Sequence, residues 1–257
     1  MPKLLIATSI ITLLTGCAAY HAPGGPANLA AIGVTPEMQA ANTPADIAAN
    51  FARQPLARFP ANVAVCRIQA SGYYSRTNQG FGGGAYSVIL TRDVEPVDAV
   101  KRLSKLPEIR GIAPIGRLLL PTQLKSDQEL RNAAAQLQCD MLLVYTLDTS
   151  FHDRDALKPL TVVTLGLSPT KVTNVTTTAS AVLLDTRSGF VYGVAEASAR
   201  KQGLASAWTS EDAIDGDRKR TETEAFEKLV GEIETMWQGV AHTFARTSTT
   251  PRTTQGG

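Results

Sequence analysis

The chain has 257 residues, of which 44% are hydrophobic and 19% are charged, and its formal net charge is +2. This composition is ordinary for a globular protein, and one domain of roughly 180 to 190 residues can bury a core without help from a metal. The small net charge excludes a strong electrostatic footprint for nucleic acid or for a strongly acidic partner.

The first segment has the layout of a bacterial secretory signal. Lys3 supplies one positive charge, and the run from Leu4 to Leu14 is mostly apolar. A membrane-spanning helix needs roughly 20 apolar residues. A run of about eleven therefore favours a cleaved signal over a spanning helix.

The end of this run, Leu14-Thr15-Gly16-Cys17, resembles the lipobox of bacterial lipoproteins. The resemblance implies cleavage before Cys17 and a lipid on that cysteine. Ala18, in place of an aspartate after the cysteine, implies an outer-membrane location. More than one acyl chain, at about 0.8 kcal/mol per buried CH₂, is needed for stable anchoring. The alternative is a plain secretory signal, or an uncleaved membrane helix, in which Cys17 has no role.

The predicted organisation is a lipoprotein signal peptide at 1–16, a flexible tether at 17–42, a periplasmic domain at 43–246 and a disordered tail at 247–257. The tether is rich in Ala, Pro and Gly and lacks sustained periodicity. The tail contains only small, polar and basic residues with one proline, which is typical of a disordered terminus.

A short helix and a strand are predicted to open the domain. Thr43-Pro44 has the chemistry of a helix start, with a hydroxyl cap and a proline at the first helical position. Ile47 and Phe51 then fall on one helical face, and the helix is expected to end near Gln54. The segment Asn62–Ala70 has the composition of a strand.

A glycine-rich segment at 80–84 has the composition of a loop that aims backbone N–H groups at an anion. It lacks the Lys-Ser/Thr ending of a nucleotide-binding loop, and the following Tyr86–Leu90 favours a strand rather than a helix. A hairpin or irregular loop is therefore the preferred interpretation. Contact with a partner is the alternative role for this loop.

The middle of the chain predicts two helix–strand units. A helix begins at Pro96 and ends before Pro107, and a strand region follows at 109–120. Ser126-x-x-Glu129 is a capping box that opens a second helix. The unbroken apolar run Met141–Leu147 then predicts a central strand that is covered on both faces.

The last third of the chain predicts strands at 160–167, 172–185 and 190–199, with a turn at 185–189. A polar loop is expected at 201–216. Thr221-x-x-Glu224 is a second capping box, which is expected to open a long helix with an apolar stripe. The stripe includes Trp237 and Phe244, and we expect both in the core.

Two segments resemble curli-secretion-channel lipoproteins and the TolB amino-terminal domain. One is Ala133-Ala134-Ala135-Gln136-Leu137 leading into Asp140-Met141-Leu142-Leu143-Val144, and the other is the strand and turn from Ala181 to Gly189. The resemblance implies an α/β fold over 60–246. The expected architecture is a single mixed β-sheet with flanking helices, in the order β-α-β-α-β-β-β-α.

The chain departs from the secretion-channel relatives at Leu160–Val182. Pro169 and Lys171 lie near the tip of this segment, and its many threonines do not give the apolar alternation of a membrane-inserted hairpin. An adaptor or accessory protein is therefore favoured over a channel.

Cys66 and Cys139 are the two cysteine side chains that remain if Cys17 carries lipid. In an oxidising compartment they either form a disulfide or stay as two buried thiols. The sequence leaves both alternatives open, because the distance between them depends on the order of the strands. Neither lies near another cysteine or a histidine at zinc spacing, so no metal site is predicted.

Few residues are candidates for chemistry. His21, His152 and His242 lie far apart in the chain, and the sequence has neither a hydrolase nucleophile elbow nor a zinc-helix motif. We interpret His152-Asp153-Arg154-Asp155 as a solvated hairpin loop, with a metal or acid/base cluster as the alternative. Asp185 is predicted to accept local backbone hydrogen bonds in its turn rather than to act in catalysis.

The basic triplet Arg218-Lys219-Arg220 is interpreted as a solvated loop before the last helix. Three positive charges at a helix N-terminus are unfavourable for the helix dipole. Contact with an anionic surface is therefore the alternative interpretation.

The preferred hypothesis is a lipid-anchored, non-catalytic envelope protein that faces the periplasm and acts as an adaptor or accessory in protein assembly, with no cofactor. Its expected partners are the membrane, through lipid on Cys17, and envelope proteins or further copies of itself. One alternative is an oligomeric secretion-channel component with Leu160–Val182 inserted as a hairpin. Another is an enzyme or small-ligand binder that uses the 80–84 loop or the His152 cluster.

Overall fold

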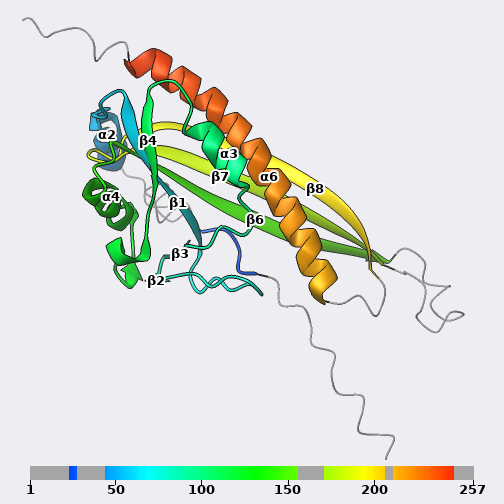
Figure 1. Cartoon of the computed structure of the whole chain (residues 1–257). Helices are drawn as coiled ribbons and strands as arrows, with labels where there is room; N and C mark the ends of the chain where they lie inside the picture. The colour runs from blue at the N-terminus through cyan, green and yellow to red at the C-terminus, as the bar shows by residue number, and fades with distance from the viewer. Residues whose placement is uncertain (1–22, 28–43, 156–170, 206–210, 246–257) are drawn as a thin grey trace, which may run out of the picture.

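The computed structural model describes residues 23–27, 44–155, 171–205 and 211–245, which form a mixed six-stranded sheet with helices on both faces (Figure 1). The predicted α/β class is confirmed. From β1 to α6 the main elements follow the predicted order β-α-β-α-β-β-β-α. A second, two-stranded sheet pairs the short strands β2 (Gly83–Gly84) and β5 (Gln123–Leu124).

The main sheet is organised around the first long strand, which pairs on both of its edges. On one edge it runs parallel to β6. On the other edge it runs parallel to β4 through its first half and antiparallel to β3 through its second half. The strands are β1 (Ala61–Ala70), β3 (Tyr86–Ile89), β4 (Ile109–Pro114), β6 (Met141–Asp155), β7 (Lys171–Asp185) and β8 (Val191–Ala205).

The core has two sides because β6 is covered on both faces, as its unbroken apolar run predicts. Alternate residues of the strand point to opposite faces. Met141 and Leu143 belong to the cluster under α6, whereas Leu142 and Val144 belong to the cluster under α4. The central-strand prediction is therefore confirmed.

Helices of very different length cover the two faces. On one face lie α3 (Val97–Leu103) and α6 (Glu211–Val240), whose 30 residues span about 45 Å. On the other face lies α4 (Asp127–Gln136), which begins with the predicted capping box: the Ser126 hydroxyl accepts from Gln128 N, and Glu129 accepts from Ser126 N. The predicted apolar stripe of the last helix is also confirmed, since Trp237 is buried and Phe244 packs against the same cluster.

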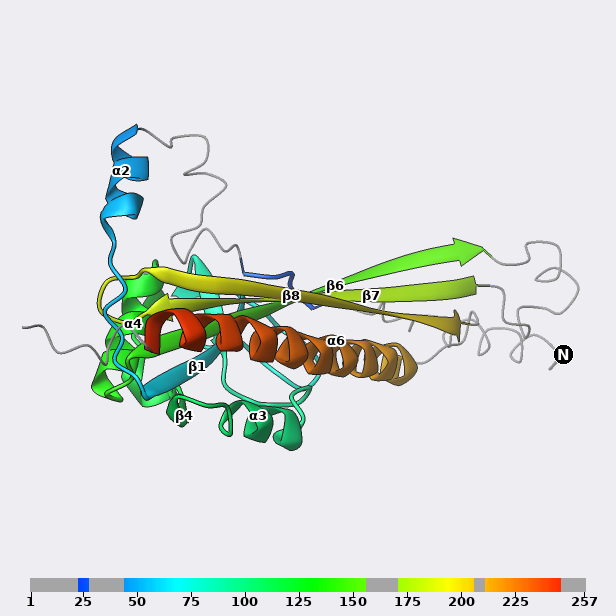
Figure 2. The same cartoon turned by 90° about the horizontal axis from the view of Figure 1, so that it is seen from above.

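Three strands extend well past the rest of the sheet. Each of β6, β7 and β8 has 15 residues, or about 50 Å of strand. Figure 2 shows their far ends, together with the N-terminal end of α6, beyond β1 and β4. The predicted strand at 160–167 and the tip of the hairpin lie outside the described residues.

The start of the last helix is predicted wrongly. The segment 201–205 continues β8, and α6 begins at Glu211 instead of after a loop that ends at 216. Thr221 is therefore no cap: it lies inside the helix and its hydroxyl donates to Asp217 O at 2.8 Å. The polar stretch forms a helix because ion pairs at i,i+3 and i,i+4 join its successive turns.

Two further elements differ from the sequence predictions. The strand expected at 109–120 ends at Pro114 and is followed by a 3₁₀ turn at Arg117–Leu119, because β3 occupies the same edge of β1 from Arg67 onward. His152–Asp155 is not a loop but the last part of β6, where His152 pairs with Asn174. Among the described helices, none is long and apolar enough to cross a membrane.

Candidate functional site

The helix α2 (Pro44–Ala52) stands away from the sheet and exposes apolar side chains (Figure 2). Pro44 and residues 47–52 are all exposed, and Phe51 and Ile47 keep 85% and 51% of their surface accessible. A helix of this length is marginal in water unless its apolar face is packed. The sequence predicts the helix and its apolar face correctly, but the structure leaves that face uncovered.

The segment after α2, by contrast, is firmly held on the β7–β8 turn. Its backbone and one arginine make four hydrogen bonds to residues of that turn and of early β8. Two run to turn side chains, one to a turn carbonyl and one to a tyrosine hydroxyl. They are Arg53 Nη1 to Gly189 O at 3.2 Å, Ser188 Oγ to Gln54 O at 2.6 Å, Leu56 N to Asp185 Oδ2 at 2.6 Å, and Ala57 N to Tyr192 Oη at 3.1 Å.

Asp185 is the centre of this attachment. Its carboxylate is fully buried and also accepts from Arg187 N at 2.8 Å, Ser188 N at 3.0 Å and the Tyr192 hydroxyl at 2.8 Å. The prediction that Asp185 accepts local backbone hydrogen bonds is confirmed. Burial and the neighbouring Asp185 carboxylate raise the pKa of Tyr192, so its hydroxyl stays a donor at physiological pH.

The exposed apolar side chains of Ile47 and Phe51 in α2, together with Leu56 just after the helix, form what we call the α2 surface. Leu56 is 50% exposed. Exposed Val191 and Val194 lie at the start of β8, the strand that leaves the same turn. Apolar residues concentrated on one element without cover mark sites of interaction with a protein or a membrane. The α2 surface is the candidate functional site.

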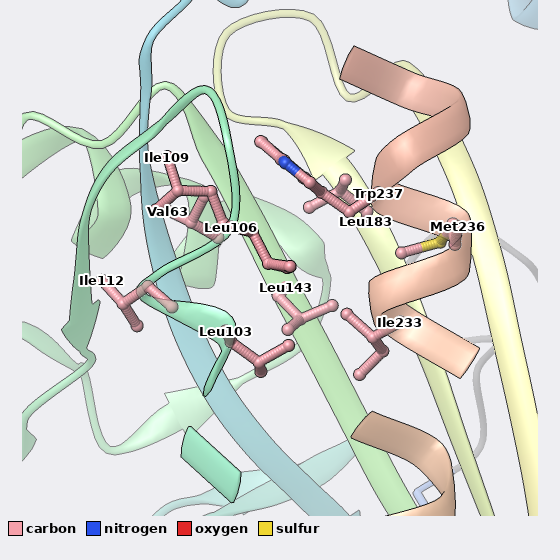
Figure 3. Close-up of a pocket in the computed structure, with 10 residues that line it drawn as sticks. All are labelled: Val63, Leu103, Leu106, Ile109, Ile112, Leu143, Leu183, Ile233, Met236 and Trp237. Carbon is pink, nitrogen blue, oxygen red and sulfur yellow. The ribbon is translucent and has the colours of Figure 1, made fainter. Parts of the chain in front are cut away.

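An apolar pocket lies beneath α6, between that helix, the α3–β4 connection and the sheet (Figure 3). Its volume is about 20 Å³, which is room for roughly one water molecule. Trp237 closes one side and donates its indole N–H to Pro107 O at 2.7 Å. The pocket is a small packing gap. Its lining residues are Val63, Leu103, Leu106, Ile109, Ile112, Leu143, Leu183, Ile233, Met236 and Trp237.

A buried charge cluster joins α6 to β1, and no sequence motif predicts it. Arg218, expected in a solvated loop, is fully buried and donates to Glu222 at 2.7 Å and to Asp215 at 3.0 Å. Arg67 of β1 lies 3.7 Å from Glu222 and donates to Glu95 at 3.2 Å. The spacing of Asp215, Arg218 and Glu222 along one helical face was the only local signal of this cluster.

The charges of this cluster stabilise one another. Desolvation lowers the pKa of Arg67, but Glu95 and Glu222 outweigh it, so the pKa lies above its ordinary value. Burial and then Glu95 raise the pKa of Tyr145, whose hydroxyl donates to Glu95 at 3.0 Å. Because the pKa values of Arg67 and Tyr145 both lie above their ordinary values, Arg67 stays charged and Tyr145 stays protonated near neutral pH. This favours a structural role for the two side chains.

The glycine-rich loop at 80–84 is part of the fold. Gly84 has a φ of +110°, and a Cβ there would lie 2.6 Å from Leu124 O. Glycine is therefore needed for β2 to pair closely with β5. The interpretation as a hairpin or irregular loop agrees with this geometry.

Cys66 and Cys139 are free and buried in the structure. Cys66 of β1 lies opposite Val144 of β6, and Val144 is five residues further along the chain than Cys139. At about 3.3 Å per residue, Cys66 and Cys139 are therefore about 16 Å apart. A disulfide requires Cα atoms within about 7 Å. Burial raises the pKa of Cys66 to about 12, so this thiol is unreactive at neutral pH.

The remaining predicted sites are not brought together. Cys17 lies outside the described residues. His152–Asp155 lies in β6, and no group of three metal-ligating side chains occurs in the part of the chain that the structure describes. Lys219 and Arg220 lie in α6 and pair with Asp215 and Asp217.

No protein-family model matches the sequence, and no curated protein matches it. Among solved structures, the chain is similar to a Xanthomonas campestris protein of family DUF330, with 12% identity and a TM-score of 0.35 over 74% of this chain and 92% of that one. It is also similar to a proposed lipoprotein from Caulobacter crescentus, with 12% identity and a TM-score of 0.26 over 45% and 78% of the two chains. Both likenesses are distant.

Proposed function

We propose that this chain is a lipid-anchored envelope protein that catalyses no reaction and acts as an adaptor by binding a protein partner through the α2 surface. The observation that carries the proposal is the contrast at α2. The helix exposes Ile47 and Phe51 to solvent, yet the segment after it is held on the β7–β8 turn by four hydrogen bonds.

The rigid attachment favours recognition over a simple linker. A helix that is fixed at one end presents its apolar side chains in a limited set of directions, which lowers the entropic cost of binding. Burial of Phe51 and Ile47 in a partner contributes roughly 1.5 to 3 kcal/mol each. This is enough for the two side chains to dominate a small interface.

The sequence supports the location. The lipobox resemblance implies a lipid on Cys17, and 26 residues separate this cysteine from α2, namely 18 to 43. A chain of this length spans at most about 90 Å, so an anchor on Cys17 would keep the α2 surface within that distance of the membrane. The outer membrane, the periplasmic orientation and the identity of the partner are parts of the proposal.

The test compares two exposed apolar residues. Phe51→Ser changes the α2 surface, and Leu118→Ser changes a residue on the 3₁₀ turn that is 99% exposed. Full-length lipidated protein is extracted in mild detergent, and its mass is measured by light scattering with the detergent mass subtracted. We expect the wild type and Leu118→Ser to remain in a complex of defined mass and Phe51→Ser to be a monomer. A monomeric wild type would contradict the proposal.

A second candidate function is a secretion-channel component. It is favoured by the projecting hairpin of β6 and β7, which pair as far as Asp155 and Lys171 (Figure 2), and by the sequence resemblance to curli-secretion-channel lipoproteins. The same light-scattering measurement separates the two candidates, because a channel predicts a closed ring of many identical subunits. A complex with a different protein favours the adaptor.

A further inference from the structure

A second concave site lies between α4 and the β7–β8 turn, and nothing in the adaptor hypothesis uses it. Gln128, Arg131, Asn132 and Ala135 form one side of it, and Thr186 and Arg187 form the other. The four helical residues are spaced i, i+3, i+4 and i+7, so they share one face of α4. The cavity volume is about 340 Å³, which is within the range of small-molecule sites. We call it the α4–turn pocket.

The two pocket walls are joined to each other and to neighbouring residues by hydrogen bonds and an ion pair. Arg131 pairs with Asp127 at 2.6 Å and donates through Nη1 to Thr186 O at 3.5 Å and Arg187 O at 3.3 Å. Thr186 N donates to Asp140 O at 3.0 Å. These contacts connect α4 directly to the turn, so the pocket is formed before any ligand arrives.

Several hydrogen-bond donors of the pocket have no partner in these contacts. Arg187 donates through Nη1 to Asp140 at 3.1 Å, and Arg131 donates through Nε to Asp127 and through Nη1 to Arg187 O. The remaining guanidinium N–H groups make no hydrogen bond to the described residues. The Thr186 hydroxyl is the strongest indication of a ligand-binding site. The residue is 6% exposed, and its Oγ1 has no hydrogen-bond partner within the described parts of the chain.

The geometry points to a binding site for a small polar molecule that carries a phosphate or carboxylate group. Two guanidinium groups on facing walls present planar N–H donors of the kind that bind such oxyanions. The amides of Gln128 and Asn132 supply further donors and acceptors for hydroxyl or amide groups of the same molecule. A buried hydroxyl without a partner is costly, and a ligand oxygen would satisfy it.

The carboxylates near the pocket do not oppose this charge preference. Asp127 and Asp140 each pair with one of the two arginines, with side chains 17% and 12% exposed. Asp185 is buried under the turn and saturated by four donors. The charged groups that face the cavity are therefore the two guanidinium groups.

The test titrates full-length protein in a non-ionic detergent with inorganic phosphate, glycerol 3-phosphate and acetate at constant ionic strength, followed by calorimetry. We expect saturable binding of at least one of these probes. Preference for phosphate or acetate identifies the oxyanion, and tighter binding of glycerol 3-phosphate than of phosphate shows that an organic phosphate is the ligand class. No binding of any probe at millimolar concentration would overturn the inference.

Three variants and a control separate binding from folding. Thr186→Val removes the unpartnered hydroxyl, so the free protein should be at least as heat-stable as the wild type while its affinity falls roughly three- to tenfold. Arg187→Gln should weaken binding about tenfold or more, and Arg187→Lys should restore part of it. Arg110→Gln, on an exposed residue of β4, should bind as the wild type does. Equal affinity in Thr186→Val, Arg187→Gln and the wild type would also overturn the inference.

Discussion

Two buried polar clusters, one around Arg67 and Arg218 and the other around Asp185, both join segments that are far apart in the chain, but they differ in what they leave exposed. In the first cluster the two arginines are buried with the carboxylates of Glu95, Asp215 and Glu222, which are their ion-pair partners. Around Asp185 the carboxylate is just as buried, but it holds a segment whose neighbouring helix stays in solvent. The first cluster holds α6 against β1, whereas the second holds the segment that carries the α2 surface.

The largest effect is expected in the enclosed cluster. Arg218→Met leaves Glu222 and Asp215 buried without their cation, which costs roughly 3 to 5 kcal/mol of unfolding free energy. Urea denaturation of this variant measures the loss. The control is Arg220→Met, whose arginine is 64% exposed and pairs with Asp217, and a loss below about 1 kcal/mol is expected there. Equal losses in both variants would contradict the enclosed role of Arg218.

A smaller effect is expected at Asp185. Asp185→Asn replaces one acceptor oxygen of a buried carboxylate by a donor amide. In one orientation of the amide this group opposes the N–H groups of Arg187 and Ser188, and in the other it opposes the N–H of Leu56. The expected loss is about 2 to 3 kcal/mol. Limited proteolysis should also cut near residues 53–57 sooner than in the wild type, because the attachment of this segment is weakened. Wild-type proteolysis in this variant would show that the segment is held by other contacts.

A still smaller effect is expected at the start of α4. Burial opposes ionisation of Glu129, but the hydrogen bonds from its own backbone and from Ser126 outweigh it and hold its pKa below the ordinary value. Glu129→Gln should therefore lose about 0.5 to 1 kcal/mol at neutral pH.

The pH dependence follows from the direction of that shift. A lowered folded-state pKa contributes stability that is present above the unfolded-state value and is lost as the pH falls through the folded-state value. Denaturation of wild type and Glu129→Gln between pH 7 and pH 3 should therefore show a difference that shrinks in acid. A difference that grows in acid would contradict the pKa direction.

The smallest effect on stability is expected on the α2 surface. Phe51→Ser should change the unfolding free energy of the isolated protein by less than about 0.5 kcal/mol, because the side chain is 85% exposed. Leu118→Ser should behave in the same way. A loss above 1 kcal/mol for Phe51→Ser alone would show that α2 packs on the body of the protein.

Features whose partners are close in the chain could be predicted from the sequence, whereas features that depend on distant segments could not. The capping box at Ser126 and the turn at Asp185 were predicted because their partners lie within three residues in the chain. The burial of Arg218 was not predicted. Its partners Asp215 and Glu222 are local, but Arg67 reaches Glu222 only after β1 is packed against α6.

The candidate sites were harder to predict than the fold. Ile47 and Phe51 predict an apolar helical face, but the sequence does not say whether the rest of the chain covers it. The α4–turn pocket combines Arg131 with Arg187, and their proximity follows from the pairing of β6 with β7 rather than from any local motif. The wrong start of α6 came from a polar segment whose charges pair along the helix instead of facing solvent.

The most direct test of the adaptor hypothesis is photo-crosslinking in intact cells, with a photoreactive amino acid at position 51 and, as the matched control, at position 118. We expect position 51 to give one adduct of defined mass, identified by mass spectrometry as a protein or as a second copy of this chain, and position 118 to give none. Lipid adducts alone at position 51 would show that α2 lies on the membrane and would contradict the account, as would the absence of any adduct.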